Sequence, residues 1–416
     1  MRTTKTVATA ATCALLIAMA ACGSDDEDPG SGGDDSAAAS GSGGSQTIKV
    51  GVITPLSGPA AATYGPAARS GVEARIAAYQ EEGGECADND FEIVDADDAS
   101  NPAGALAATQ RLVQQEEVYA ILSSSSNFFG ATQFVTTQGA GTPVLGDVTD
   151  QSPEWREVGN NMFPAQPVPD PEAVYSNTGE FFETIGATTF GGVAFSVPAS
   201  AAALQSAADS AEAAGLEVGY LNPNVQFGST DVGPIVLGIK DSGTDGVYLP
   251  ITFDTALAVV QGLEQEGVET KGILAATGYG ADLLDNPVAI EAAQGVSFSI
   301  GYAPVSLGTE ATERLANAVR DEGVESGIPG YAMSSGWLNA DLLLHGLEVA
   351  GCDATQQEFI DALNQDDTFD ASGLYGQPID FTVADQAQSC QYYVTLEGEE
   401  FVPVEGASPA CGERIN

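Results

Sequence analysis

A run of four serines has the residue types and the position of a small-molecule binding loop. Ser123–Ser126, with Asn127 directly after it, follows the apolar stretch Val118–Leu122 and precedes a helical stretch. Where a strand passes into a helix, hydroxyls and free backbone N–H groups converge on an anion, and the helix dipole adds to the attraction. Serine and asparagine are also common in turns and helix caps, so a purely structural role is the alternative.

The second polar segment is Gly146–Asp150, with the sequence GDVTD. The carboxylates of Asp147 and Asp150 could pair with a cation, and Thr149 adds a hydroxyl. The alternative is that both aspartates are solvated helix caps, which a chain this acidic has in number.

Residues that would support catalysis are scarce. The only histidine, His345, lies in the apolar helical stretch Leu342–His345, a setting typical of packing or of a helix surface. The sequence has no GxSxG, Walker A or GxGxxG motif, and no CxxC pair or Cys/His cluster that would hold zinc. We therefore expect a binding protein rather than an enzyme, with no cofactor and no metal.

The N-terminus has the organisation of an export signal. Arg2 and Lys5 precede an uncharged run, residues 6–21, which is too short to span a bilayer but has the length of a signal h-region. The run ends Met19-Ala20-Ala21-Cys22-Gly23, which resembles the lipobox of bacterial lipoproteins. This resemblance implies cleavage before Cys22, a diacylglyceryl group on its thiol and acylation of the new N-terminus, a firm anchor to the outer face of the membrane. The alternative is an ordinary secretory signal with an incidental cysteine.

A tether follows the predicted anchor. Residues 23–45 are rich in Gly, Ser, Ala and acidic residues and contain no large apolar residue. Such a segment cannot bury enough surface to offset its ordering entropy, so we expect residues 22–45 to form a flexible spacer. Its acidic cluster Ser24–Asp28 is explained by solvation more simply than by metal binding.

The overall charge excludes one class of partner. The sequence has 12 Lys+Arg against 59 Asp+Glu, a formal charge of −47. A surface of this kind repels nucleic acid, so no phosphate-backbone partner is expected. Removal of residues 1–21 would leave 395 of the 416 residues, a length that suits two domains.

Four cysteines remain after Cys13 leaves with the signal and Cys22 receives lipid: Cys86, Cys352, Cys390 and Cys411. An even number of widely spaced cysteines in an exported chain predicts two disulfides. Three connectivities are open.

Strand and helix patterns alternate along the chain. Strands are predicted at 46–53, 91–95, 118–122, 143–145, 192–197, 216–220, 246–251 and 272–274. Helices are predicted at 66–82, 101–115, 199–214, 231–240, 254–266, 309–322, 331–350 and 355–363, and a β-hairpin at 377–402. Repeated strand–helix–strand units indicate parallel sheets covered on both faces. The strands are too many for one sheet, so the predicted fold is α/β with two doubly wound domains, whose ligands would bind beyond the carboxyl ends of the strands.

A series of segments resembles the type I periplasmic binding proteins, and more closely the branched-chain amino acid (Leu/Ile/Val) and amide-type receptors of ABC importers. The resemblance covers residues 47–404. In chain order its segments are residues 48–59 (IKVGVITPLSGP) with Tyr64-Gly65, Asp95–Asp98, Ser123–Ser126, Gly141–Val144, Phe227-Gly228 with Asp231, Asp245–Tyr248 and Tyr331-Ala332.

The resemblance implies two lobes joined by three crossovers that close on a small solute by a hinge motion. Lobe 1 would comprise residues 46–164 and 298–372, and lobe 2 residues 165–297 and 373–412. It also implies a monomer that delivers its solute to a permease and an ATPase. Because each lobe would then contain two of the four cysteines, this assignment favours the pairs Cys86–Cys352 and Cys390–Cys411.

The resemblance also assigns positions in the first lobe's binding site. The residue that holds a substrate carboxylate in amino-acid-binding relatives matches Ser126 or Asn127, with Ser125 beside it. The threonine that binds the solute matches Thr149 if one residue is inserted, and Asp150 otherwise.

In lobe 2 the sequence departs from the amino-acid receptors. Thr252, with Phe253 beside it, stands where they commonly have a tyrosine, and residues 277–280 (TGYG) stand where they have a glutamate for the substrate ammonium. A desolvated ammonium without a counter-charge costs several kcal/mol. Either Asp147 or Asp150 therefore replaces the glutamate, or the ligand is not an α-amino acid.

Four aromatic residues are candidates for the pocket walls, and each is alternatively a core residue: Tyr64, Phe128, Phe253 and Tyr279. Together these features predict a lipid-anchored receptor for an amino acid, an amide, or an aromatic or apolar acid, coupled to an ABC importer. A solute-sensing lipoprotein coupled to a signalling partner is the alternative, since the receptor itself would look the same.

Overall fold

The computed structural model describes residues 46–168, 173–226, 228–229, 231–384 and 390–416. The predicted signal sequence, Cys22, the tether and Phe227 lie outside these ranges. Within them, no helix combines the length and the apolar composition needed to cross a membrane.

The first sheet consists of five parallel strands in the order β2-β1-β3-β4-β5. Its strands are β1 (Thr47–Thr54), β2 (Asp90–Asp97), β3 (Ala120–Ser123), β4 (Val144–Gly146) and β5 (Met162–Pro164). The helices that lie between them are α1 (Ala67–Glu82), α2 (Pro102–Gln114), η1 (Phe128–Gly130), α3 (Thr132–Val135) and η2 (Pro153–Arg156). Three helices and a short turn from much later in the chain join this lobe: α10 (Glu310–Asp321), α11 (Tyr331–Ala350), α12 (Gln356–Leu363) and η4 (Ala371–Gly373).

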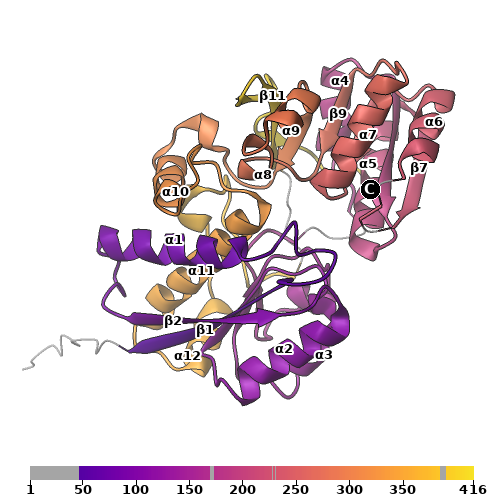
Figure 1. Ribbon diagram of the computed structural model, residues 1–416. Helices are drawn as coiled ribbons and strands as arrows, with labels where there is room; N and C mark the ends of the chain where they lie inside the picture. Colours follow the sequence, from indigo (N-terminus) through magenta and orange to yellow (C-terminus); the bar gives the residue numbers. More distant parts are fainter. Residues whose placement is uncertain (1–45, 169–172, 227, 230, 385–389) are drawn as a thin grey trace, which may run out of the picture. The chain divides into compact units, whose positions relative to one another are not determined.

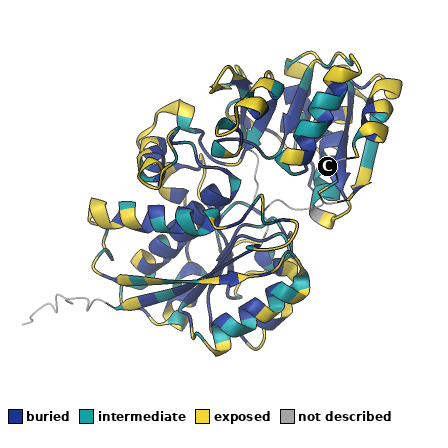
Figure 2. Cartoon of the chain, in the orientation of Figure 1, coloured by how far each residue is buried: buried dark blue, intermediate teal, exposed yellow. Residues whose placement is uncertain are grey.

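Helices cover both faces of the first sheet, with α1 and α11 on one side and α2 and α3 on the other (Figure 1). Successive residues of a strand point to opposite faces. Val50 and Val52 of β1 therefore pack in the cluster that contains α1 and α11, whereas Ile53 packs with α2. Buried residues accordingly concentrate in the strands and on the sides of the helices that face them (Figure 2).

The helices α1 and α11 pack backbone against backbone. A Cβ atom on Gly71 would lie 2.0 Å from the carbonyl oxygen of Met333, and one on Gly336 would lie 1.9 Å from the carbonyl oxygen of Ala68. Only glycine fits at these two positions, so this close contact is specified by the sequence.

The second sheet has eight strands, seven of them in the order β12-β11-β10-β9-β8-β6-β7, with β13 paired to β11. Its parallel strands are β6 (Thr189–Phe195), β7 (Glu217–Val225), β8 (Gly246–Leu249), β9 (Gly272–Ala275) and β10 (Ser297–Ile300). Its antiparallel strands are β11 (Cys390–Glu397), β12 (Glu400–Pro403) and β13 (Ala410–Cys411).

The helices of this second lobe lie on both sides of its sheet. They are α4 (Asn177–Thr184), α5 (Pro198–Ala213), α6 (Gly233–Ser242), α7 (Phe253–Gln265), α8 (Ala281–Leu284) and α9 (Pro287–Ala292). The turn η3 (Val305–Leu307) follows β10 and contacts both β12 and α10. Phe181 and Phe190 pack with Leu204 of α5 in one cluster, whereas Ile235 of α6 and Val259 of α7 belong to another. The predicted α/β fold with two parallel-sheet lobes is confirmed.

The chain passes between the two sheets three times: after β5, after β10 and after η4. The passing segments are bonded to one another. The backbone N–H of Ala303 donates to the carbonyl oxygen of Leu374 at 2.9 Å, and the Tyr375 hydroxyl donates to the carbonyl oxygen of Ala165 at 2.6 Å.

Both predicted disulfides are present, Cys86–Cys352 and Cys390–Cys411. The first joins the segments that follow α1 and α11, the two helices in backbone contact. The second joins the antiparallel strands β11 and β13, in which its two cysteines are paired in register.

Several element boundaries differ from the prediction. The hairpin strand that we expected from Gln377 begins at Cys390, and Ile379 forms only an isolated bridge with Phe369. The strand expected from Gly192 begins at Thr189. In contrast, the helix predicted from Asn101 begins there, because the Asn101 side chain caps α2 by accepting a hydrogen bond from the Gly104 backbone N–H at 2.9 Å.

Candidate ligand-binding site

Four segments of the first lobe bring polar and aromatic side chains together. Three of them follow the carboxyl ends of β1, β3 and β4 and contribute Tyr64, Ser126 and Thr149, and the fourth is the start of α11 with Tyr331. The rings of Tyr64 and Tyr331 form an edge-to-face pair with centroids 5.6 Å apart. The edge of a parallel sheet where strands pass into helices is where such folds bind ligands.

The carboxylate of Asp147 lies behind these side chains and is fully buried. One of its oxygens accepts a hydrogen bond from the Thr149 hydroxyl and the other from the Ser335 hydroxyl, both at 2.6 Å. Ser335 is also 2.7 Å from the hydroxyl of Ser124, which accepts a bond from the Asn339 amide at 3.1 Å. A buried polar chain thus connects the loops after β3 and β4 to helix α11.

Burial dominates the electrostatics of the cluster. It raises the pKa of Asp147, and the hydrogen bonds from Ser335 and Thr149 offset only part of this effect. Burial, together with the neighbouring Asp147 charge, raises the pKa of Tyr64 to about 12, against the opposing contacts with Thr149 and Ser126. Tyr64 therefore carries a neutral hydroxyl at any physiological pH.

Two other predicted residues of this loop, Ser125 and Phe128, make contacts inside the first lobe that hold the loop in place. Ser125 is buried and its hydroxyl donates to the carboxylate of Asp98, while its oxygen accepts the backbone N–H of Asn127 at 3.0 Å. Phe128 is fully buried and packs at 6.0 Å from the ring of Trp155 on the α2 side of the sheet. Ser126, in contrast, contacts the hydroxyl of Tyr64.

Asp150 points away from the cluster. Its carboxylate accepts hydrogen bonds from the Ser152 hydroxyl at 2.5 Å and from the indole N–H of Trp155 at 2.6 Å. Burial raises its pKa to about 6, so this carboxyl takes up a proton in mildly acidic solution. Of the two aspartates that could replace the missing glutamate, only Asp147 adjoins Thr149 and Tyr64.

The predicted residues of the second lobe lie in the loops after β8 and β9. Thr252 is the N-cap residue of α7, and the half-buried ring of Phe253 packs over the backbone of Gly278. The Tyr279 hydroxyl accepts the backbone N–H of Val305 at 2.9 Å, and its ring packs 4.7 Å from that of Phe401. Tyr279 is thus part of a packed aromatic cluster.

Sequence reasoning missed Ser335 and Asn339 as parts of the cluster, and it assigned no role in the site to Ser124 or Tyr331 individually. The signal that could have found Ser335 and Asn339 is their presence in a mostly apolar helix, since buried polar groups need partners. In the described part of the chain, no group of three or more His, Cys, Asp or Glu side chains is placed to hold a metal.

Comparison with known proteins identifies the family. The sequence pattern of the periplasmic binding proteins matches residues 47–400. The chain belongs to this family. A search of curated protein sequences gave no match.

Solved periplasmic binding proteins share the fold at low sequence identity. A solute-binding protein of an ABC transporter from R. palustris, in complex with benzoate, is 19% identical, has a TM-score of 0.70 and covers 88% of this chain and 98% of its own. A fatty acid ABC transporter substrate-binding protein from Thermomonospora curvata is 20% identical, with a TM-score of 0.67 and coverage of 89% and 93%. A leucine-binding protein from Thermotoga maritima is 17% identical, with a TM-score of 0.65 and coverage of 86% and 97%.

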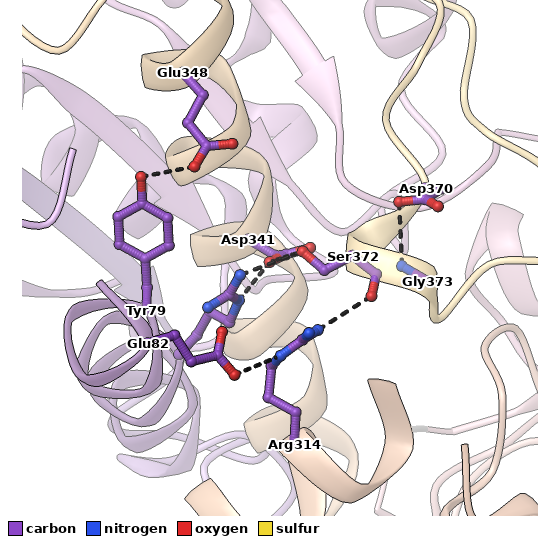
Figure 3. A network of polar contacts seen from close by, with 9 residues as sticks. Tyr79, Glu82, Arg314, Asp341, Glu348, Asp370, Ser372 and Gly373 are labelled. Atoms are coloured by element: carbon purple, nitrogen blue, oxygen red, sulfur yellow. Dashed lines mark hydrogen bonds and ion pairs between the residues drawn. The ribbon is translucent and has the colours of Figure 1, made fainter. Parts of the chain in front are cut away.

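A second polar network lies between α1, α10, α11 and the turn η4, where the chain leaves the first lobe (Figure 3). The buried guanidinium of Arg75 pairs with the carboxylate of Asp341, and the Ser372 hydroxyl bonds to both. Arg314 donates to the Glu82 carboxylate at 2.8 Å and to the carbonyl oxygen of Ser372 at 3.2 Å.

This network borders a polar cavity of about 320 Å³. Both arginines that line it already have carboxylate partners, so we assign the network a structural role. Ala371 and Ser372 of the turn have positive φ angles of 53° and 52°, which costs energy for residues with a Cβ atom. The bonds from Arg75, Asp341 and Arg314 hold the turn in this conformation.

Proposed function

We propose that this member of the periplasmic binding protein family is an extracytoplasmic solute receptor, anchored by lipid at Cys22, that delivers a small molecule to an ABC importer. The observation that carries the proposal is the convergence of Tyr64, Ser126, Thr149 and Tyr331 at the carboxyl ends of the parallel strands. In this proposal the solute is an amino acid, an amide, or an aromatic or apolar acid, and the second lobe closes over it with Thr252 and Phe253.

Two further points support a receptor of this kind. Proteins with the same fold are named for, or were solved with, benzoate, fatty acid and leucine, all small solutes with an apolar part. The cluster itself combines apolar ring surface with a few converging hydroxyls, the usual composition of a small-molecule site.

Binding is tested by thermal unfolding of the mature chain in the presence of amino acids, amides and aromatic acids. A solute at 100 times its Kd should add about 2.7 kcal/mol to the free energy of unfolding. Thr149→Val removes a hydroxyl at the site and should weaken binding by about 3- to 10-fold, the loss of one hydrogen bond. Thr137→Val, at an exposed threonine after α3, is the matched control and should bind like the parent. If no solute raises the melting temperature, the proposed receptor function is wrong.

The anchor is tested separately in cells. Cys22→Ala should abolish incorporation of labelled fatty acid and shift the protein from the membrane fraction to the medium or periplasm. Retention of the label by the variant would show that Cys22 is not the acylated residue.

A further inference from the structure

The buried ring of Trp155 contacts the two segments that carry Ser126 and Thr149 in the candidate site. It packs 6.0 Å from the ring of Phe128, which follows Ser126 by two residues. It also lies against the backbone of Gly146, where a Cβ atom would come within 2.7 Å of the indole. Gly146 is the last residue of β4, and the loop that contains Thr149 begins there. One ring therefore supports both loops.

The carboxylate of Asp150 orients this ring. Asp150 directly follows Thr149 and is itself buried. One of its oxygens accepts the indole N–H of Trp155 at 2.6 Å, and the other accepts the hydroxyl of Ser152 at 2.5 Å. An indole can only donate, so its orientation depends on this one acceptor. The bond joins the end of the Thr149 segment to the ring that also supports the Ser126 segment.

The strength of this bond depends on the charge of Asp150. In residues 147–157 the other charged side chains are Asp147, Glu154, Arg156 and Glu157, and η1, α3, β4 and β5 contain no charged residue. Burial raises the pKa of the carboxyl to about 6, with the charge of Asp147 acting in the same direction and the bonds from Ser152 and Trp155 opposing it. A proton taken up in this range goes to the Ser152 side, because a hydroxyl can reverse its bond and an indole cannot. The indole bond then loses its charge assistance, and charge-assisted hydrogen bonds are about twice as strong as neutral ones.

We propose that Asp150 is a positioning residue of the receptor site, which acts through Trp155 to hold the Thr149 and Ser126 segments in one arrangement without touching the solute. This role rests on the proposed receptor function and adds a residue that the function alone does not require. A preorganised site loses less free energy to ordering when the solute binds. Because the bond to Trp155 is stronger when Asp150 carries its charge, solute affinity should decrease as the pH falls through about 6.

Calorimetry of the mature wild-type chain between pH 5 and pH 8 tests this dependence, with leucine, phenylalanine, benzamide and benzoate as probes. The affinity for a probe that binds should be about 3- to 10-fold lower at pH 5 than at pH 7.5, the effect of weakening one hydrogen bond. The midpoint should lie near pH 6. If none of the four probes binds at any pH, the receptor function is refuted and the role of Asp150 falls with it.

Asp150→Asn imitates the protonated carboxyl, since the side chain keeps its volume and loses its charge. The variant should bind about 3- to 10-fold more weakly than wild type at pH 7.5 and equally at pH 5. The difference between the two proteins isolates Asp150 from Asp147, another carboxyl whose pKa is raised by burial. Asp245→Asn, the same substitution directly before β8 in the second lobe, should stay within about 2-fold of wild type. A wild-type pH profile in folded Asp150→Asn protein would overturn the inference and leave the receptor function standing.

Trp155→Phe tests whether Asp150 acts through the ring, and it keeps the test decisive if Asp150→Asn does not fold. It removes the indole N–H and leaves an aromatic ring near Phe128. Its affinity should not vary around pH 6. The double variant Asp150→Asn/Trp155→Phe should bind no more weakly than the weaker single variant, because both changes remove the same bond. Losses that add, or a midpoint near pH 6 that remains in Trp155→Phe, would contradict a role through Trp155.

Tryptophan fluorescence provides a readout that requires no solute and that a general loss of stability would not produce. The emission of an indole responds to a charge beside its N–H, so the emission of Trp155 should titrate with a midpoint near pH 6. The change should be absent in Asp150→Asn and in Trp155→Phe, where Trp337, the only other tryptophan, still emits. Wild-type emission that stays constant between pH 5 and pH 8 would overturn the inference even if a solute binds.

Discussion

Asp341→Asn should lower the free energy of unfolding by about 3–5 kcal/mol, since it leaves the charge of Arg75 buried without its counter-ion. Arg75 is 4% exposed and Asp341 1% exposed, so both charges are largely removed from bulk water. The substitution preserves the side-chain volume, so the loss measures charge rather than packing. Urea unfolding followed by circular dichroism gives the free energy.

Two comparisons isolate the effect of burial. Arg69 and Glu73 form an ion pair on the same helix at 34% and 37% side-chain exposure, and Glu73→Gln should cost less than about 1 kcal/mol. The double variant Arg75→Met/Asp341→Leu should lose much less than Asp341→Asn, because it removes both charges together. The Nη1 atom of Arg75 and the Oδ2 atom of Asp341 have no hydrogen-bond partner among the described residues. The hydrogen bonds of the native pair therefore offset only part of the cost of burying its two charges. A double variant as unstable as the single one would contradict this account.

Removal of the Cys86–Cys352 disulfide should destabilise the protein more than removal of Cys390–Cys411. The two bonds close loops with sequence separations of 266 and 21 residues. Loop-closure entropy in the unfolded chain then gives about 6 kcal/mol for the longer loop and about 3 kcal/mol for the shorter one. The measurement is urea unfolding of the two double variants, Cys86→Ser/Cys352→Ser and Cys390→Ser/Cys411→Ser.

The paired design also tests the mechanism. Each variant replaces one disulfide with two serine hydroxyls. Cys86 is buried whereas Cys411 is exposed, so the difference between the variants reports loop length together with the cost of burying the hydroxyl at position 86. Equal losses would mean that local contacts, and not the entropy of the unfolded chain, account for the stabilisation.

The regular elements were predictable wherever local chemistry marks their ends. Helix α11 begins at Tyr331 and ends at Ala350 as predicted, because Gly330 and Gly351 flank a long, mostly apolar segment. The prediction that the first hairpin strand begins at Gln377 was wrong. The turn at Gly398 marks where the hairpin reverses, but nothing in the local sequence marks where its first strand begins. Strand length here depends on pairing with β10, which lies far earlier in the sequence, and with β13.

The candidate site was predictable as a set of loops but not as a set of side chains. Topology brings the ends of β1, β3 and β4 to one edge, and the sequence pattern located all three. Which serine of the run faces that edge depends on the position of Asp98, since its carboxylate accepts a hydrogen bond from the Ser125 hydroxyl. The contribution of Ser335 depends on α11 crossing the sheet, a contact between residues nearly two hundred positions apart.

Helix α11 also determines when the first lobe can be completed as the chain is synthesised. It covers one face of the sheet β1–β5 together with α1, and it leaves the ribosome only after the whole of β6–β10. Until then that apolar face is covered only in part and Cys86 has no disulfide partner, a state prone to aggregation. Chains with this order of elements should therefore depend on chaperones more than chains whose lobes are contiguous, and a stop codon before Tyr331 should leave the amino-terminal lobe unable to fold alone.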